Sequence, residues 1–197
     1  MPLRFFTAGE SHGPLLTAIV DGLPAGLPLQ PADIDQHLTR RQQGYGSGGR
    51  MKIESDQVQI TGGWLTGQTT GAPLALQVIN RDHAKWRGKA VDPMTAPRPG
   101  HADLTGALKY GYDDLRYALE RASARETTMR VAVGAVCLRL LAELGITIGS
   151  YVTEIGTVAV HLPPELTYPE RFAAAESSPV RCPDPTASTA MQTHIRD

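Results

Sequence analysis

The sequence predicts an α+β fold, in which strands and helices are mixed without a regular β-α-β alternation. Short segments of alternating apolar residues, typical of strands, occur near the N-terminus, between residues 57 and 80, and again after residue 146. The apolar stretch from 126 to 144 instead repeats at three- and four-residue steps, which is typical of a helix. The 197 residues suffice for one large domain or two small ones, and a single domain over 1–197 is expected.

The first 80 residues combine strands with one helix. Four strands are expected, at Leu3–Thr7, Leu15–Asp21, Gln57–Thr61 and Pro73–Asn80. Pro31 is well placed to begin a helix over Ala32–Arg41, whose first turn carries acidic side chains that favour the helix dipole.

The second half begins with an irregular, charged stretch over residues 81–103, and a loop of that length is usually functional or disordered. A helix is expected over Glu126–Leu144, with Gly145 as its C-terminal stop. Later elements are expected as strands at Ile146–Glu154 and Thr157–Val160, a short helix at Pro169–Ser177, and a loop-like tail from Ser178.

Composition favours a globular cytoplasmic protein. The chain is 41% apolar and 20% charged, and it lacks the run of ~20 apolar residues that a membrane helix requires. The N-terminus is too short in its apolar part for a signal peptide. Cys137 and Cys182 have no neighbours at metal-ligand spacing, so neither a zinc site nor a disulfide framework is expected.

Charge is unevenly distributed along the chain. Residues 40–130 carry ten Arg and four Lys against nine acidic residues, a net charge of +5, whereas the remainder carries −6. Guanidinium groups bind phosphate and carboxylate at two points, so an arginine-rich middle favours a small polyanionic ligand. Scattered surface charge is the alternative.

Two glycine-containing turns present histidines. Gly9–Gly13, with the sequence Gly-Glu-Ser-His-Gly, places His12 where an imidazole can donate a proton near neutral pH. In Arg98–Asp103 a Pro-Gly pair presents Arg98 and His101 together. The alternatives are that His12 only caps a hairpin turn and that His101 has a structural role.

Arg40–Arg50 contains the spacing GxGxxG at residues 44–49, which is typical of dinucleotide-binding loops. That assignment fails because a helix is expected before the loop, a strand after it, and no acidic residue lies ~20 positions onward. We interpret the segment as a glycine loop between Arg41 and Arg50 that closes over an anion. A flexible solvent-exposed loop is the alternative.

Glu120–Arg130 leads into the expected long helix. Helix N-termini offer unpaired backbone N–H groups and a partial positive charge. Together with Arg121, Ser123 and Arg125, these groups form a candidate cradle for phosphate or carboxylate. The alternative is an exposed helix start whose Glu/Arg pairs contribute on the order of tenths of a kcal/mol each. The remaining histidines lie in no comparable context: His37, His83, His161 and His194.

These four segments, in their order along the chain, resemble the chorismate synthase family, and the similarity covers essentially the whole chain. The resemblance implies the family's β-α-β sandwich. It also implies the family's reaction, the 1,4-anti elimination of phosphate from 5-enolpyruvylshikimate 3-phosphate to give chorismate, the last common step of aromatic amino acid biosynthesis. Reduced FMN is the implied cofactor, NADPH is an open candidate for reducing it, and a homotetramer is the implied assembly at full length.

The resemblance also assigns roles to residues at matching positions. It implies that His12 protonates the leaving phosphate and that His101 lies against the reduced flavin. The residues implied to bind the phosphorylated substrate are Ser11, Arg41, Arg50, Arg98, Ala124 and Arg125. Those implied to bind the cofactor are Arg121, Ala122 and Ser123, and no metal ligand is implied.

Two departures from the family pattern bear on function. Ser47 stands where many members have an arginine, and the chain is expected to stop before the family's C-terminal region, which supplies most flavin contacts. A second hypothesis is therefore a truncated, non-catalytic module that binds the anionic substrate without a complete flavin site. No membrane partner is expected, and a nucleic-acid binder is disfavoured because the basic middle has few clustered lysines and little aromatic interleaving.

Overall fold

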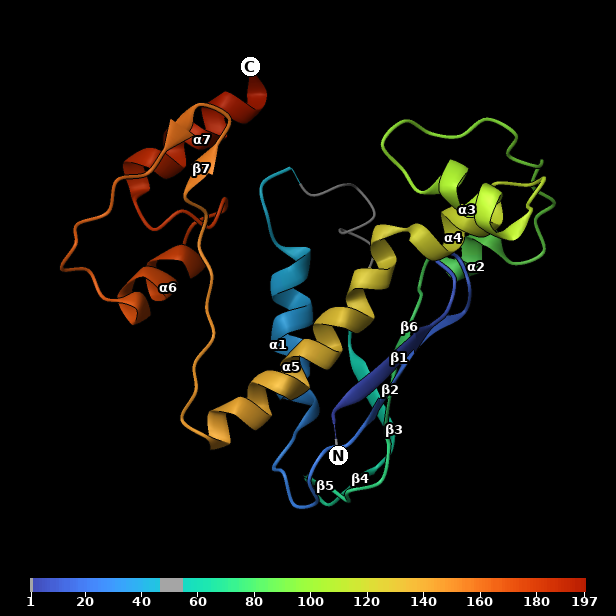
Figure 1. Cartoon of the computed structure of the whole chain (residues 1–197), viewed down its shortest axis with the longest axis horizontal. Coiled ribbons are helices and arrows are strands. Elements are labelled where there is room, and N and C mark those ends of the chain that lie inside the picture. The colour runs from blue at the N-terminus through green and yellow to red at the C-terminus, as the bar shows by residue number, and fades with distance from the viewer. Residues whose placement is uncertain (1, 47–54) are drawn as a thin grey trace. The chain divides into compact units, whose positions relative to one another are not determined.

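The structure is a computed structural model that describes residues 2–46 and 55–197, and its mixture of helices and sheets confirms the α+β class. It divides into two compact units (Figure 1). Unit 1 comprises Met1–Arg41 and Gly49–Leu140, and unit 2 comprises Gln42–Gly48 and Leu141–Asp197. The single domain expected from the sequence stays a prediction, because two compact units can still fold together.

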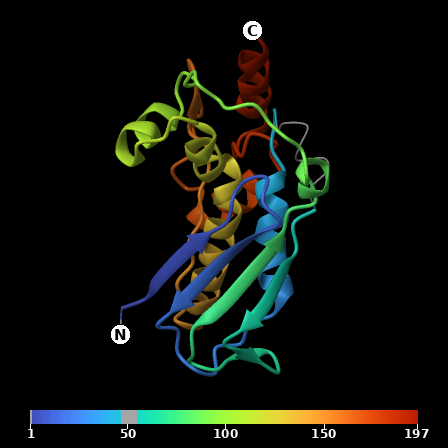
Figure 2. The same cartoon turned by 90° about the vertical axis from the view of Figure 1, so that its right-hand side faces the viewer.

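Unit 1 is built on a four-stranded sheet in which every neighbouring pair is antiparallel. Its strands in spatial order are β1 (Arg4–Ala8), β2 (Leu15–Asp21), β6 (Leu74–Ile79) and β3 (Val58–Gly62). The four strands expected from the alternating pattern are therefore confirmed to within a residue or two. Figure 2 shows the helices α1 (Pro31–Gln42) and α5 (Thr127–Glu143) on the same side of this sheet.

The core of unit 1 lies between that sheet and two helices, α1 (Pro31–Gln42) and α5 (Thr127–Glu143). Alternate residues of the two central strands are buried on the helix side: Leu16, Ala18 and Val20 from β2, and Leu74, Leu76 and Val78 from β6. The helices contribute Ile34, Leu38, Met129, Ala132, Val133 and Val136. Both helices were predicted: α5 from its three- and four-residue apolar period, and α1 from Pro31 and the acidic side chains of its first turn.

Shorter elements occupy the rest of unit 1. They are the hairpin β4 (Trp64–Leu65) and β5 (Gln68–Thr69), and the helices α2 (His83–Trp86), α3 (Asp103–Tyr110) and α4 (Arg116–Ala122). The irregular stretch expected over residues 81–103 thus contains one short helix. Helices α3 and α4 pack closely, because a Cβ at Gly106 would lie 2.5 Å from the Cβ of Ala118.

Unit 2 contains the hairpin β7 (Glu154–Ile155) and β8 (Val158–Ala159), and the helices α6 (Tyr168–Glu176) and α7 (Pro185–Arg196). The strands expected over Ile146–Glu154 and Thr157–Val160 are wrong in extent, because only two residues of each strand pair. The short helix near Pro169 is confirmed. The loop-like tail is wrong: Asp184 caps α7 by accepting the N–H of Ala187 at 2.6 Å.

Candidate active site

The Gly9–Gly13 turn joins β1 to β2 at one end of the sheet. Gly9 has a φ of 115°, and a Cβ there would lie 2.7 Å from the carbonyl oxygen of Leu15. Any other residue would strain the backbone and clash with it. The glycine therefore lets the turn fold tightly enough to hold Ser11 and His12 against the rest of unit 1.

Asn80 shapes this turn from the end of β6. Its side-chain N–H groups donate to the carbonyl oxygens of Gly13 at 2.8 Å, Glu10 at 3.2 Å and Ser11 at 3.4 Å. Asn80 is 2% exposed, so these carbonyls are satisfied by a buried side chain. The amide orientation is set by its oxygen, which accepts from Nε of Arg125 at 2.7 Å.

Helix α4 binds the same turn from the other side. The backbone N–H of Ser11 donates to the carbonyl of Glu120 at 3.2 Å, and its hydroxyl donates to the hydroxyl of Ser123 at 2.9 Å. The Glu120 carboxylate lies 2.6 Å from Nδ1 of His12. Two residues predicted for different ligands, Ser11 for substrate and Ser123 for cofactor, are therefore in direct contact.

Helix α2 adds two further contacts to His12. The ring of Trp86 lies against the imidazole, with 4.3 Å between ring centroids and 46° between planes. Nδ1 of His83 donates to the backbone carbonyl of His12 at 2.8 Å. The imidazole is 23% exposed, so the contacts restrict it without closing it off.

Arg125 is 5% exposed and ion-paired. Nη1 lies 2.7 and 2.8 Å from the two oxygens of Asp56, whose side chain is fully buried. Arg41 joins this group at 3.6 Å from Asp56, and it also donates to the carbonyl of Ala124 at 2.9 Å. The structure thus brings Arg41, Ala124 and Arg125 together, while their binding of substrate stays a prediction.

Arg121 extends from the last turn of α4 and is 46% exposed. It pairs with Glu126 and donates to the hydroxyl and carbonyl of Thr7 at 3.0 and 3.1 Å. Glu126 also accepts from the hydroxyl of Thr7 and lies 3.5 Å from Arg130. This cluster fixes the start of α5 to the end of β1.

Arg98 and His101 lie on a separate, locally held turn. Arg98 binds Asp103 at two points, 2.8 Å from Nε and 2.9 Å from Nη2. These side-chain hydrogen bonds lower the pKa of the buried Asp103 to about 2 and raise that of Arg98. His101 is exposed, and within the described ranges neither it nor Arg98 bonds to the His12 turn.

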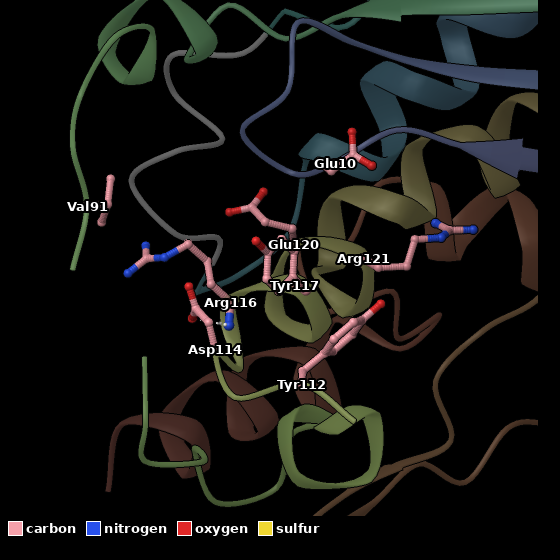
Figure 3. Close-up of a pocket in the computed structure, with 8 residues that line it drawn as sticks. All are labelled: Glu10, Val91, Tyr112, Asp114, Arg116, Tyr117, Glu120 and Arg121. Carbon is pink, nitrogen blue, oxygen red and sulfur yellow. Dashed lines mark hydrogen bonds between the residues drawn. The ribbon is translucent and has the colours of Figure 1, made fainter. Parts of the chain in front are cut away.

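Two cavities lie beside α4. One of about 480 Å³ is lined by Glu10, Val91, Tyr112, Asp114, Arg116, Tyr117, Glu120 and Arg121 (Figure 3). Arg116 and Arg121 extend in opposite directions from the helix in that view. The second, of about 510 Å³, is bounded mainly by apolar atoms of tyrosine and alanine side chains: Tyr110, Tyr112, Tyr117, Ala102, Ala118 and Ala122. Lys109 and Arg121 also line it. Arg121 borders both.

Arg50 and Ser47 lie outside the described residues, so their predicted roles stay predictions. In the part of the chain that is described, no three His, Cys, Asp or Glu side chains gather to hold a metal ion. No described helix is long and apolar enough to cross a membrane.

Sequence reasoning missed several residues that build this site. Glu120 lay within a recognised motif but was treated only as a partner in helix-surface charge pairs. His83 was dismissed for lack of context, although it binds the His12 carbonyl. Asn80 and Asp56 follow and precede strands of the sheet, and a polar residue at a strand end was the available signal.

Comparison with known proteins supplies the family. The sequence profile of the chorismate synthase family matches residues 3–197. Chorismate synthases of Streptococcus pneumoniae (strain Hungary19A-6) and Streptococcus thermophilus (strain ATCC BAA-491 / LMD-9) are each 56% identical over 90% of this chain and 49% of their own length. The chain therefore spans about half the length of these curated relatives.

A solved structure gives the same result. A crystal structure of chorismate synthase matches 98% of this chain and 52% of its own, with a TM-score of 0.78 and 43% sequence identity. Similarity of sequence and of fold coincide over nearly every residue. The chain therefore belongs to the chorismate synthase family, a family of lyases in aromatic amino acid biosynthesis.

Proposed function

We propose that this chain forms the substrate-facing part of an enzyme that eliminates phosphate from 5-enolpyruvylshikimate 3-phosphate to give chorismate. The observation that carries the proposal is the His12 turn, which α2, α4 and Asn80 hold at one end of the sheet. A positioned imidazole can protonate the phosphate as its C–O bond breaks, and a protonated phosphate is the better leaving group. The substrate's phosphate and two carboxylates also account for the arginine excess.

Reduced FMN is the proposed cofactor, and the residues present fit it. The cavity of about 510 Å³ offers tyrosine and alanine side chains for a planar ring system, with Lys109 and Arg121 as cations for its phosphate. Two predicted cofactor residues, Arg121 and Ala122, line it, and Ala102 next to His101 does too. When bound, the reduced flavin would supply electron density to the breaking C–O bond.

The chain's own residues would orient and protonate the substrate. His12 would hold the transferable proton, while Ser11 and Ser123 would fix the turn that carries it. Arg121 would present a partly exposed guanidinium to an anion beside α4. The proposal includes a homotetramer in the cytoplasm, with NADPH as a candidate reductant, and these parts rest on the family alone.

The test is chorismate formation under anaerobic conditions with reduced FMN, in protein of the relatives' full length that carries this segment. His12→Asn should lower kcat by about 10²–10⁴-fold, the usual contribution of a general acid. His161→Asn, at an exposed histidine of unit 2, is the matched control and should leave turnover unchanged. An active His12→Asn enzyme would refute the assigned role.

The second candidate is a binding module that holds the anionic substrate without turning it over. The observation favouring it is the cavity of about 480 Å³, whose lining includes Arg116 and Arg121 as cations for an anionic ligand. Calorimetric titration of the 197-residue chain with the substrate separates the two, because binding without chorismate formation supports the module.

A further inference from the structure

Both carboxylate oxygens of Glu120 bind the same residue, His12. Oε2 accepts the backbone N–H of His12 at 2.8 Å, and Oε1 lies 2.6 Å from Nδ1 of its ring. Glu120 projects from α4 toward the cavity of about 480 Å³, as Figure 3 shows, and its side chain is 16% exposed. The two bonds fix the imidazole relative to its own backbone.

This geometry determines which ring nitrogen carries a proton. An ionised carboxylate only accepts hydrogen bonds, so Nδ1 of His12 must be the donor to Oε1. The partner of one ring nitrogen decides the state of the other, and Nε2 is therefore the nitrogen left to face a ligand. Without such a partner, the populations of the two tautomers and of the side-chain rotamers would be set by interaction with water.

The surrounding contacts hold the pair together. The N–H of Ser11 donates to the Glu120 carbonyl at 3.2 Å, so turn and helix cannot separate without breaking this bond. Trp86 covers part of the ring, and His83 holds the His12 carbonyl. Glu120 is thus fixed at its backbone while its carboxylate holds the ring.

We propose that Glu120 is a positioning residue that keeps His12 in the Nδ1–H form and aims Nε2 at the reacting ligand. The hold on the ring stands on the geometry alone. Its importance for turnover rests on the proposed function, in which the His12 imidazolium, protonated on both ring nitrogens, gives its Nε2 proton to the leaving phosphate and is left in the Nδ1–H form that Glu120 binds.

Glu120→Gln tests the hold sharply because glutamine has the same size but only one acceptor. The His12 backbone N–H cannot become an acceptor, so the amide oxygen must face it and the amide NH₂ must face the ring. Nδ1 then accepts a hydrogen bond, and the ring should switch to the Nε2–H tautomer. Glu120→Ala should instead release the ring to the tautomer mixture found in water.

The measurement is ¹H–¹⁵N NMR of the ¹⁵N-histidine-labelled chain, about two pH units above the usual histidine pKa of ~6.5, where imidazoles are neutral. His12→Asn assigns the signal among the six histidines. The wild-type chain should show protonated Nδ1 and Glu120→Gln protonated Nε2. Glu126→Gln is the matched control, because it removes a carboxylate that binds Thr7 and Arg121 and should leave the tautomer unchanged.

The proposal is overturned if Glu120→Gln keeps the Nδ1–H pattern, or if Glu126→Gln switches it equally. If Glu120→Ala fails to fold, the size-matched glutamine variant still decides. In a catalytically competent full-length protein, Glu120→Gln should lower kcat by about 10²–10⁴-fold with little change in KM. A switched tautomer with unchanged turnover would support the hold on His12 and refute the proposed function instead.

Discussion

The two histidine turns of unit 1 are held in opposite ways. The His12 turn is bound by residues 67 to 112 positions away in the sequence, from the end of β6 and from the segment of α4 and Ser123. The turn that carries His101 is held by Arg98 and Asp103, which are five positions apart. His12 is therefore placed by the tertiary fold of unit 1, whereas the His101 turn is shaped by its own sequence.

The difference shows what a short sequence motif can and cannot specify. Arg98–Asp103 contains both partners of its principal ion pair, so the motif alone defines the turn. Gly9–Gly13 supplies only the backbone freedom and the His12 side chain. Its geometry depends on Asn80, Glu120 and the buried pair behind them.

The largest expected effect comes from removing the support behind the His12 turn. Asp56→Ala would remove the Asp56 carboxylate from the Arg125 guanidinium, which is 4% exposed. Loss of one partner of a buried ion pair costs about 3–5 kcal/mol, so the free energy of unfolding should fall by that amount. Urea denaturation followed by circular dichroism measures it.

Asp92→Ala, at an exposed residue, is the control, and its free energy of unfolding should stay within about 0.5 kcal/mol of that of the wild-type chain. Adding Arg125→Met to Asp56→Ala should recover part of the loss, because the Arg125 charge is then no longer buried in the absence of Asp56. If Asp56→Ala costs no more than Asp92→Ala, the buried pair does not support the turn.

An intermediate effect is expected for Asn80→Ala. The substitution leaves three turn carbonyls without their buried donor, and we expect a loss of about 1–3 kcal/mol. Amide NMR signals of Ser11 and His12 should shift, while those of the Arg98–Asp103 turn should not. Equal shifts in both turns would contradict the independence inferred from their contacts.

The smallest effect belongs to the local turn. Because Arg98 lowers the pKa of Asp103 from 3.8 to about 2, the pair's stabilisation is present above about pH 4 and lost as pH falls toward 2. Arg98 is 39% exposed, so Asp103→Asn should cost at most about 1 kcal/mol at neutral pH.

Urea unfolding at a series of pH values measures the contribution of the Arg98–Asp103 pair to the free energy of unfolding. The difference between the wild-type chain and Asp103→Asn should shrink between pH 4 and 2, since the carboxyl group of the wild-type chain becomes protonated there. A difference that grows over the same range would show that the pair is not the source.

The fold was predictable where the buried apolar residues of a strand or helix repeat at a regular spacing in the sequence. Strands β2 and β6 bury alternate residues, and α5 buries a repeating face, so their patterns were visible in the sequence. Helix α3 was not, because it buries only Asp103 and exposes Leu104 and Leu108. Helix α7 begins with Asp184 as its N-cap and Pro185 in its first turn, a typical helix start. It was not predicted, because the preceding Cys182-Pro183 was interpreted as part of a loop.

The sequence indicated several residues that the structure brings together at α4, but not the residues that hold them there. Ser11, His12, Arg121 and Ser123 lie in recognisable motifs, and the structure gathers them at α4. Arg125 was expected to face a ligand, yet its guanidinium binds Asn80 and Asp56, which lie on other segments of unit 1. A single sequence does not reveal such pairings, because the partners are brought together only by the sheet.

The tethering of the His12 turn also bears on the order of folding. Contacts between residues 67 to 112 positions apart require large loops to close, and such closures are entropically costly and slow. The Arg98–Asp103 turn can form as soon as its six residues are available. On the ribosome, His12 would therefore gain its final surroundings only after the segment through Arg125 has emerged.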